Sequence, residues 1–153
     1  NIVDIGNYVM LLTGQPIAHT GTLEIGSRLI VSYVPQDMSF LSGSADDFAA
    51  ESEIDITLFK TILRKLDFKR TQLTKDMSEF SMGQKKKVLL ARSLCQRANL
   101  YIWDEPLNYI DVISRLQIET LILEYKPTML FVEHDEAFVN DIATKVCRIS
   151  LNQ

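Results

Sequence analysis

The second half of the chain alternates short apolar segments with stretches of helical spacing. Leu100–Trp103, Thr128–Val132 and Lys145–Ser150 have the length and apolar content of strands. Between them the spacing predicts helices over Asp111–Glu124 and Glu136–Ala143. Such alternation predicts an α/β fold with a mostly parallel sheet.

The first half of the chain carries extended segments and a predicted helical insertion. Thr22–Ile25 and Leu29–Val34, joined by Gly26-Ser27, indicate an N-terminal β hairpin or a paired edge. Ser39–Ala50 is rich in Ser, Gly, Asp and Ala, which is typical of a loop. One amphipathic helix is expected next, with these apolar positions at helical spacing: Ile54, Leu58, Ile62, Leu63 and Leu66. Residues 37–79 are therefore predicted to be a short helical insertion within a single domain, 1–153.

A longer helix is expected after Ser81, which is a favourable N-cap, and it should run to about Arg97. Its predicted apolar face consists of Val88, Leu89, Ala91, Leu94 and Cys95. The run Lys85–Lys87 in the same helix is, by default, a solvated face.

Composition narrows the class of protein. Hydrophobic residues make up 46% of the 153 residues and charged residues 24%, as in globular chains with one compact core. A net charge of −4 gives no overall case for nucleic-acid binding. No membrane-length apolar run and no signal peptide are present in the sequence, so we expect a cytoplasmic protein without membrane insertion. Cys95 and Cys147 are expected to be buried free thiols.

Two acidic residues follow the apolar segment that leads to Trp103. Adjacent acids near a strand end are most often surface or capping residues. Here Asp104 and Glu105 would instead stand at the carboxyl edge of a buried strand, where ligand sites occur in parallel sheets. Asp104 is the predicted metal partner, holding Mg²⁺, and Glu105 is the predicted base that polarises water.

Three further features are candidates for a nucleotide site, and two of them follow predicted strands. Phe80–Gln84 precedes a helix and offers a hydroxyl, free backbone N–H groups and the positive end of a helix dipole to a phosphate, although an ordinary serine cap has the same pattern. His134 follows the apolar segment Met129–Val132. Gln36 follows Pro35, where an amide can contact a nucleotide or a metal-bound water.

In this order, these elements resemble the conserved motifs of ABC-type ATPase cassettes, and the resemblance extends over nearly the whole chain from about Thr13. The matching segments are Gln36 as the Q-loop, Phe80–Gln84 as the signature, Leu100–Glu105 as Walker B, Asn108–Asp111 as the D-loop and Phe131–Asp135 as the switch-histidine loop. The fold expected from this resemblance is a partial P-loop NTPase, with residues 80–153 running from the signature to the switch histidine.

Within that superfamily, Trp103–Asp111 is most similar to the ABC-F proteins of the Lsa and Vga type, which protect bacterial ribosomes from antibiotics. Those proteins carry two cassettes on one chain and no membrane domain. The present chain resembles their second cassette, and the linker between the cassettes is absent here. The resemblance implies a second cassette, the ribosome and tRNA as partners.

The resemblance also implies roles for single residues in binding ATP and Mg²⁺. Glu105 would activate the attacking water and His134 would sense the γ-phosphate. Asp104 and Gln36 would help place Mg²⁺. The residues expected at ATP come from the signature and the D-loop, and the signature serves the nucleotide of the other cassette: Ser81, Gly83, Gln84 and Asp111.

The chain departs from the family pattern in two places. No Walker A phosphate loop is recognisable, because Tyr8–Gly14 resembles the helix that follows this loop, and Asn1–Asn7 lacks the expected lysine and hydroxyl. Truncation is favoured over a naturally degenerate cassette. A truncated cassette is expected to be inactive alone and to expose a sheet edge, through which a homodimer of the fragment can form.

The second departure is in the signature. Met82 stands where the signature usually has glycine, and Phe80 where it usually has leucine.

Two other functions remain open from the sequence. The chain would be the nucleotide-binding subunit of a membrane transporter if its helical insertion forms a coupling surface. It would be a noncatalytic RNA or ribosome interaction module if Lys85–Lys87 and Arg92 contact RNA phosphates.

Overall fold

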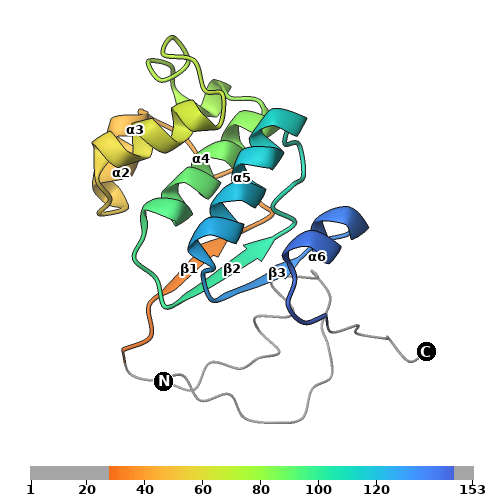
Figure 1. Cartoon of the computed structure of the whole chain (residues 1–153). Helices are drawn as coiled ribbons and strands as arrows, with labels where there is room; N and C mark the ends of the chain where they lie inside the picture. The colour runs from red at the N-terminus through yellow and green to blue at the C-terminus, as the bar shows by residue number, and fades with distance from the viewer. Residues whose placement is uncertain (1–27, 147–153) are drawn as a thin grey trace, which may run out of the picture.

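The computed structural model describes residues 28–146 of the chain. Its helices and strands are labelled as in Figure 1. Their bounds are β1 Val31–Val34, α2 Ala45–Glu51, α3 Ile56–Lys65, a 3₁₀ turn Met77–Glu79, α4 Met82–Cys95, β2 Leu100–Asp104, α5 Val112–Tyr125, β3 Met129–Val132 and α6 Glu136–Ile142. None of the helices in this range is long and apolar enough to cross a membrane.

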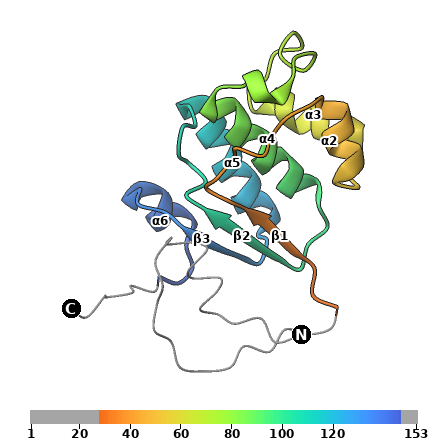
Figure 2. The ribbon, with the colours of Figure 1, turned by 180° about the vertical axis from the view of Figure 1, so that it is seen from behind.

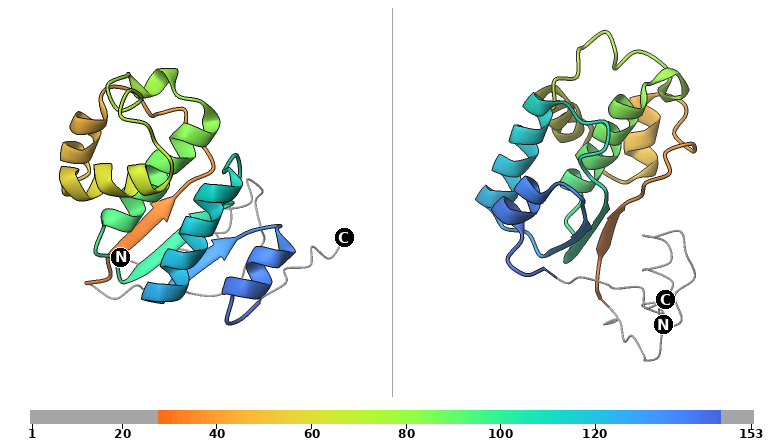
Figure 3. Two further views of the ribbon diagram at one scale, coloured as in Figure 1. Left: turned by 45° about the horizontal axis from the view of Figure 1, so that its top comes forward. Right: turned by 90° about the vertical axis from the view of Figure 1, so that its right-hand side faces the viewer.

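The three strands form a parallel sheet in the order β1-β2-β3. Trp103 is the partner of Val34 on one side and of Phe131 on the other. Helices α4 and α5 lie against one face of this sheet, as Figure 2 and the side view in Figure 3 show. The α/β fold with a parallel sheet is therefore confirmed.

Local capping explains where α4 begins. The Ser81 side chain accepts a hydrogen bond from the Gln84 backbone N–H at 3.3 Å, and the Gln84 side chain accepts one from the Ser81 N–H at 3.0 Å. Such a capping box satisfies two backbone donors that a helix leaves free at its first turn. The helix ends at Cys95, slightly before the predicted Arg97, because Gln96 is already extended and leads toward β2.

The core lies between the sheet and α4, and a small polar network joins them. Trp103 is almost fully buried, and its indole N–H donates to Ser93 Oγ at 2.9 Å. Ser93 Oγ also lies 2.7 Å from Ser32 Oγ, so one hydroxyl group on α4 satisfies polar groups from β1 and β2. Because buried polar groups are costly without partners, this network favours one register of the two strands against α4.

The insertion differs from its prediction. The sequence predicts a loop over Ser39–Ala50, but Ala45–Glu51 forms α2, so the insertion contains two α-helices rather than one. The Ser and Asp residues that indicated a loop are the N-terminal residues of this helix, where Ser44 accepts a hydrogen bond from the Asp47 N–H at 3.1 Å. Two small residues, Ala45 and Ala49, are buried one turn apart and let α2 pack closely into the core.

Some predictions fall partly or wholly outside the described residues. Thr22–Ile25, the first arm of the expected hairpin, lies outside them, as does Cys147. Most of the expected strand Lys145–Ser150 does too. Cys95 is a free thiol and is half-buried, and this burial raises its pKa to about 11.

Candidate functional site

The predicted site residues follow the carboxyl ends of the three strands. Gln36 comes two residues after β1, Glu105 directly after β2 and His134 two residues after β3. Because neighbouring parallel strands end at one edge of a sheet, these side chains meet there.

Glu105 is at the centre of the group. Its Oε2 accepts hydrogen bonds from Gln36 Nε2 at 2.7 Å and from Asn108 Nδ2. Its Oε1 lies 3.4 Å from His134 Nε2. The Glu105 side chain is 18% exposed and that of His134 is 83% exposed, so a carboxylate held by two amides faces a histidine that is open to solvent.

The backbone at Glu105 is in the left-handed region, with φ of +44°. A residue other than glycine occupies this region at a cost of about 1–3 kcal/mol, so other contacts must hold it there. The Glu105 N–H donates to the Val132 carbonyl at 2.9 Å, and the side chain is held as described above. The carboxylate is thus fixed at the sheet edge at the expense of backbone strain.

Asp104 is almost fully buried, and neither of its carboxylate oxygens has a hydrogen-bond partner among residues 28–146. Burial, reinforced by the negative charge of Glu105 and opposed by Lys86, raises the pKa of Asp104 to about 6. A buried carboxylate without partners is unfavourable, and a cation at its oxygens would relieve that cost. Mg²⁺ prefers oxygen ligands and often takes only one or two protein carboxylates beside phosphate oxygens, so Asp104 fits a Mg²⁺ site.

Lys86 lies on α4 and connects this helix to the carboxyl ends of β1 and β2. Its side chain is fully buried, and Nζ donates to the Asp104 carbonyl at 3.1 Å and to the Pro35 carbonyl at 3.3 Å. Burial lowers the pKa of Lys86, although nearby carboxylates, first of all Asp104, act in the opposite direction. One ammonium group therefore forms hydrogen bonds to both backbone segments that precede Gln36 and Glu105.

The expectation that Lys85–Lys87 form a solvated face is wrong for two of the three residues. Lys86 is buried as described, and Lys87 is mostly buried and pairs with Asp111 at 2.6 Å. Arg92 is partly buried and donates to the Tyr33 carbonyl. Because α4 packs against the sheet as well as α3, these basic side chains point into the protein and the run presents no RNA-binding face.

The signature residues form a second group, at the start of α4. The Ser81 and Gln84 side chains form the capping box of this helix, and Met82 is about half exposed. Gly83 lies against the D-loop, since a Cβ atom there would come within 2.5 Å of the Tyr109 carbonyl oxygen. Beside this contact is an open depression of about 240 Å³ lined by signature, D-loop and insertion residues, among them Ser81, Gly83, Gln84, Lys69, Lys87 and Asp111.

Asp111 fastens the D-loop to two helices. It caps α5 through the Ser114 N–H at 2.9 Å, and it pairs with Lys87 of α4. Burial alone would raise the pKa of Asp111, but hydrogen bonds from Lys87 and Ser114 outweigh this effect and hold the pKa well below its usual range. Asp111 therefore stays ionised, with its carboxylate directed at protein partners.

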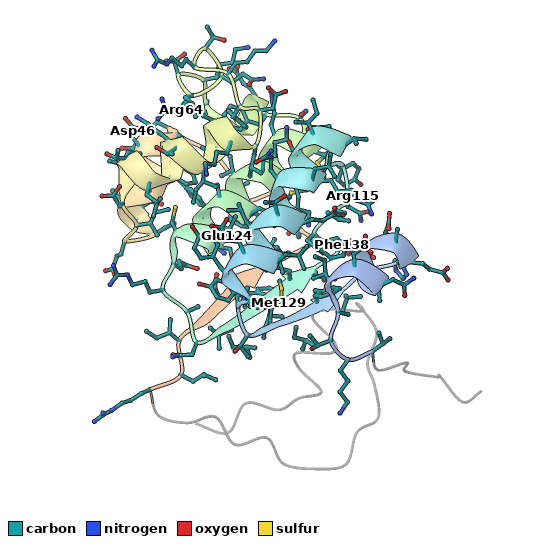
Figure 4. The ribbon with its side chains drawn as sticks, viewed as in Figure 1. Asp46, Arg64, Arg115, Glu124, Met129 and Phe138 are labelled. Carbon is teal, nitrogen blue, oxygen red and sulfur yellow. The ribbon has the colours of Figure 1, made fainter. Side chains whose placement is uncertain are left out.

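Sequence reasoning assigned no role to Glu133, Asn108 or Arg115. The Glu133 carboxylate accepts hydrogen bonds from the Leu107 N–H at 3.1 Å and the His134 N–H at 2.8 Å, and so connects the loops after β2 and β3. Arg115 of α5 (Figure 4) holds Asp135, the cap of α6, through two nitrogens at 2.6 and 2.9 Å. For Glu133 the available signal was an acid directly beside His134 at the end of a strand.

The site residues thus divide into two groups. Gln36, Asp104, Glu105 and His134 gather at the sheet edge, and the remaining predicted residues surround the depression: Ser81, Gly83, Gln84 and Asp111. Both groups are attached to α4, the first through Lys86 and the second through the start of the helix.

The sequence and the fold are similar to those of known proteins. The family model for the ABC transporter matches residues 9–108. The chain is 34% identical over 137 residues to YdiF of Bacillus subtilis, covering 85% of this chain and 21% of YdiF. It is 30% identical over 145 residues to the ATP-binding protein Uup of Buchnera aphidicola, covering 90% of this chain and 24% of Uup. The chain therefore spans only about a fifth to a quarter of the length of these two relatives.

Solved structures give the same result. RNase-L Inhibitor superposes with a TM-score of 0.63 at 25% identity, over 90% of this chain and 28% of that one. A cobalt transport ATP-binding protein superposes with a TM-score of 0.63 at 23% identity, over 76% of this chain and 46% of that one, which shows the fold alone. Together with the family match over most of its length, these findings show that the chain belongs to the ATP-binding cassettes of the ABC transporter family.

Proposed function

We propose that this cassette hydrolyses ATP as part of an ABC-F protein that acts on the ribosome in the cytoplasm. The observation that carries the proposal is Glu105, a carboxylate held by Gln36 and Asn108, with His134 3.4 Å from its free oxygen. Beside it lies Asp104, a buried carboxylate without partners. A positioned base next to a cation ligand is the arrangement that phosphoryl transfer to water requires.

Each residue of the sheet-edge group has one task in this proposal. The amides of Gln36 and Asn108 occupy Oε2 of Glu105, which leaves Oε1 to take a proton from the attacking water. His134, held through Glu133, would contact the terminal phosphate from the exposed side. Asp104 and Gln36 would hold Mg²⁺, which when bound neutralises charge on the phosphate oxygens.

The second group would serve another nucleotide. Ser81, Gly83 and Gln84 lie around the depression rather than around Glu105, so they are free to cover ATP held by a second cassette. Backbone N–H groups and the dipole at the start of a helix favour an anion at this position. The second cassette is a homologous domain of the same protein or a second copy of this chain.

The ABC-F assignment is supported by the relatives. One is named ABC transporter F family member 2, from Arabidopsis thaliana, with 31% identity over 90 residues, 59% of this chain and 13% of that protein. Action at the ribosome is supported by a similar solved structure that contains an archaeal ribosome recycling factor, with a TM-score of 0.62 at 25% identity, over 90% of this chain and 28% of that one. The finer proposal, ribosome protection against antibiotics as in Lsa and Vga proteins, rests on the segment Trp103–Asp111.

Calorimetry with Mg²⁺–ATP tests nucleotide binding. We expect the chain extended upstream through a phosphate loop to bind ATP, because a loop of backbone N–H groups and a lysine holds the phosphates in this fold. The chain of residues 1–153 serves as the control and should bind weakly or not at all. Tight binding by this control would contradict the expected dependence on a phosphate loop.

The role of Glu105 is tested by Glu105→Gln in the extended chain, in the presence of a partner cassette. Loss of a positioned base should lower turnover by about 10²- to 10⁴-fold while ATP binding persists. Steady-state phosphate release and calorimetry give the two readouts. The matched control is Glu124→Gln, an exposed carboxylate on α5 (Figure 4), which should leave turnover unchanged. Normal turnover in Glu105→Gln would remove Glu105 from the mechanism.

A further inference from the structure

The charges of the helical insertion are separated along the chain. Its first part, residues 37–55, carries only acidic charges: Asp37, Asp46, Asp47, Glu51, Glu53 and Asp55. Residues 60–75 carry basic charges, with Asp67 as the one acid among them: Lys60, Arg64, Lys65, Lys69, Arg70 and Lys75. Two acids, Asp76 and Glu79, follow at the end of the insertion. A strongly positive segment thus stands out on a chain whose net charge is −4.

Most of these basic side chains are exposed. Lys60 is paired with Asp46 at 2.5 Å, whereas the other five are exposed to solvent. Within residues 28–146, no salt bridge joins any of those five to a carboxylate. We call the four that do not line the signature depression the basic turn: Arg64, Lys65, Arg70 and Lys75. Figure 4 shows Arg64 at the end of α3, where this turn begins.

The backbone of the basic turn is ordered by short-range hydrogen bonds. The Gln72 N–H donates to the Lys69 carbonyl at 3.0 Å, and the Lys75 N–H donates to the Gln72 carbonyl at 3.1 Å. Leu73 packs against the core and anchors the middle of the segment. The loop that carries Arg70 and Lys75 is therefore defined, and it lies at the top of the view in Figure 1, remote from the sheet.

An ordinary structural role explains only part of this pattern. Arg64 and Lys65 lie in the last turn of α3, where positive charge stabilises the helix dipole. Arg70 and Lys75 are beyond the helix and gain nothing from it. Two exposed cations in a compact loop therefore need another explanation.

We infer that the basic turn binds the phosphate backbone of RNA. The inference rests on the proposed action at the ribosome and names the surface that would contact ribosomal RNA. One uncharged donor lies between the cations, since Thr71 is exposed in the same loop. The Thr74 hydroxyl is also exposed, but it donates to the Thr71 carbonyl at 3.1 Å. Hydroxyl groups and lysine or arginine side chains supply most protein contacts to nucleic-acid phosphates.

Other partners suit the basic turn less well. A membrane-surface segment needs large apolar side chains beside its cations. Here the nearby apolar residues Ile62, Leu63 and Phe68 are buried in the core. Leu58 is the one exposed apolar side chain of α3, and no large apolar side chain of residues 59–75 is exposed. The acidic segment 37–55 of a second copy is the competing partner, and the experiment must separate it from RNA.

The test is fluorescence anisotropy of a labelled RNA duplex of about 20 base pairs, titrated with the full chain without ATP. The variant carries Lys65→Gln, Arg70→Gln and Lys75→Gln. The matched control carries Arg97→Gln, Lys126→Gln and Lys145→Gln, which are exposed outside the turn and give the same net charge. Arg97 and Lys126 lie in the loops before β2 and β3, at the amino ends of these strands, whereas the sheet-edge group lies at their carboxyl ends.

We expect the unmodified chain and the control to bind RNA with a salt dependence that reflects about three phosphate contacts, a roughly 40-fold weakening between about 50 and 200 mM salt. The turn variant should lose this affinity, and its remaining binding should depend on salt with a slope smaller by about 2–3. Circular dichroism checks that both variants are folded.

Three results would overturn the inference: no RNA binding by the unmodified chain, equal losses in both triple variants, or displacement of RNA by polyglutamate at equal charge. A different result would assign the basic turn to a second copy of the chain. In that case the chain does not bind RNA, it associates with itself at low salt in a concentration-dependent way, and only the turn variant loses this self-association. Because no step uses ATP, failure here leaves the tests of Glu105 and of ATP binding unaffected.

Discussion

At the scale of one residue, the buried carboxylate of Asp104 is unfavourable to the stability of the folded chain. The residue ends a buried strand, and its two oxygens find no donor among residues 28–146. A neutral side chain would suit this position better in the absence of a cation. This unfavourable burial is what we expect of a residue that binds a cation, as proposed above for Asp104.

This conflict predicts a pH-dependent effect of Asp104→Asn. The pKa is raised from 3.8 to about 6, so the folded chain binds more protons than the unfolded chain in this range, and stability falls as the pH rises through it. The variant should be more stable than the unmodified chain by about 1–2 kcal/mol at pH 8 and similar to it near pH 4. Urea unfolding at both pH values measures the difference.

The control for this prediction is Glu53→Gln, an exposed carboxylate in the turn between α2 and α3. It should show no gain in stability at pH 8. If Asp104→Asn is destabilising at pH 8, then Asp104 has a favourable partner that contradicts the orphaned carboxylate described above.

At the scale of elements, contacts local in sequence made much of the fold predictable. The start of α4 depends on Ser81 and Gln84, which are three residues apart, and β2 and β3 are short apolar runs between helices. The clustering of Gln36, Glu105 and His134 follows from the parallel order of the strands.

What the sequence did not reveal depends on tertiary packing. Lysine runs are usually solvated, and only the position of α4 between the sheet and α3 buries Lys86. Helix α2 was missed because Ser44 and Asp47, which cap it, are equally typical of a loop. The contact between Gly83 and Tyr109 joins residues far apart in sequence.

That contact leads to a prediction for Gly83→Ala. In an unobstructed helix, alanine is more favourable than glycine by about 0.8–1 kcal/mol. Here the added methyl group would lie 2.5 Å from the Tyr109 carbonyl oxygen, so the D-loop must shift. We expect a net loss of about 1–3 kcal/mol in the free energy of unfolding, measured with urea.

Met82→Ala is the control for this prediction, because Met82 is in the same helical turn and its side chain is half exposed. It should cost less than Gly83→Ala. A stabilising effect of Gly83→Ala would show that the D-loop does not approach α4 as closely as described.

At the scale of the whole molecule, the two groups of site residues lead to a complementation experiment. Glu105 belongs to the sheet-edge group and Ser81 to the signature group. If each group acts on a different nucleotide, an active site in a homodimer combines Glu105 of one copy with Ser81 of the other. A mixture of Glu105→Gln and Ser81→Arg chains, both extended through a phosphate loop, would then contain dimers with one intact site.

Each variant alone should be nearly inactive, because both of its sites carry a defect. With random pairing in a symmetric dimer, an equal mixture should recover about a quarter of the unmodified rate of phosphate release. If both groups served the same nucleotide within one copy, mixing would restore nothing, since no copy in the mixture has both residues. Recovery on mixing therefore distinguishes a shared ATP site from a self-contained one.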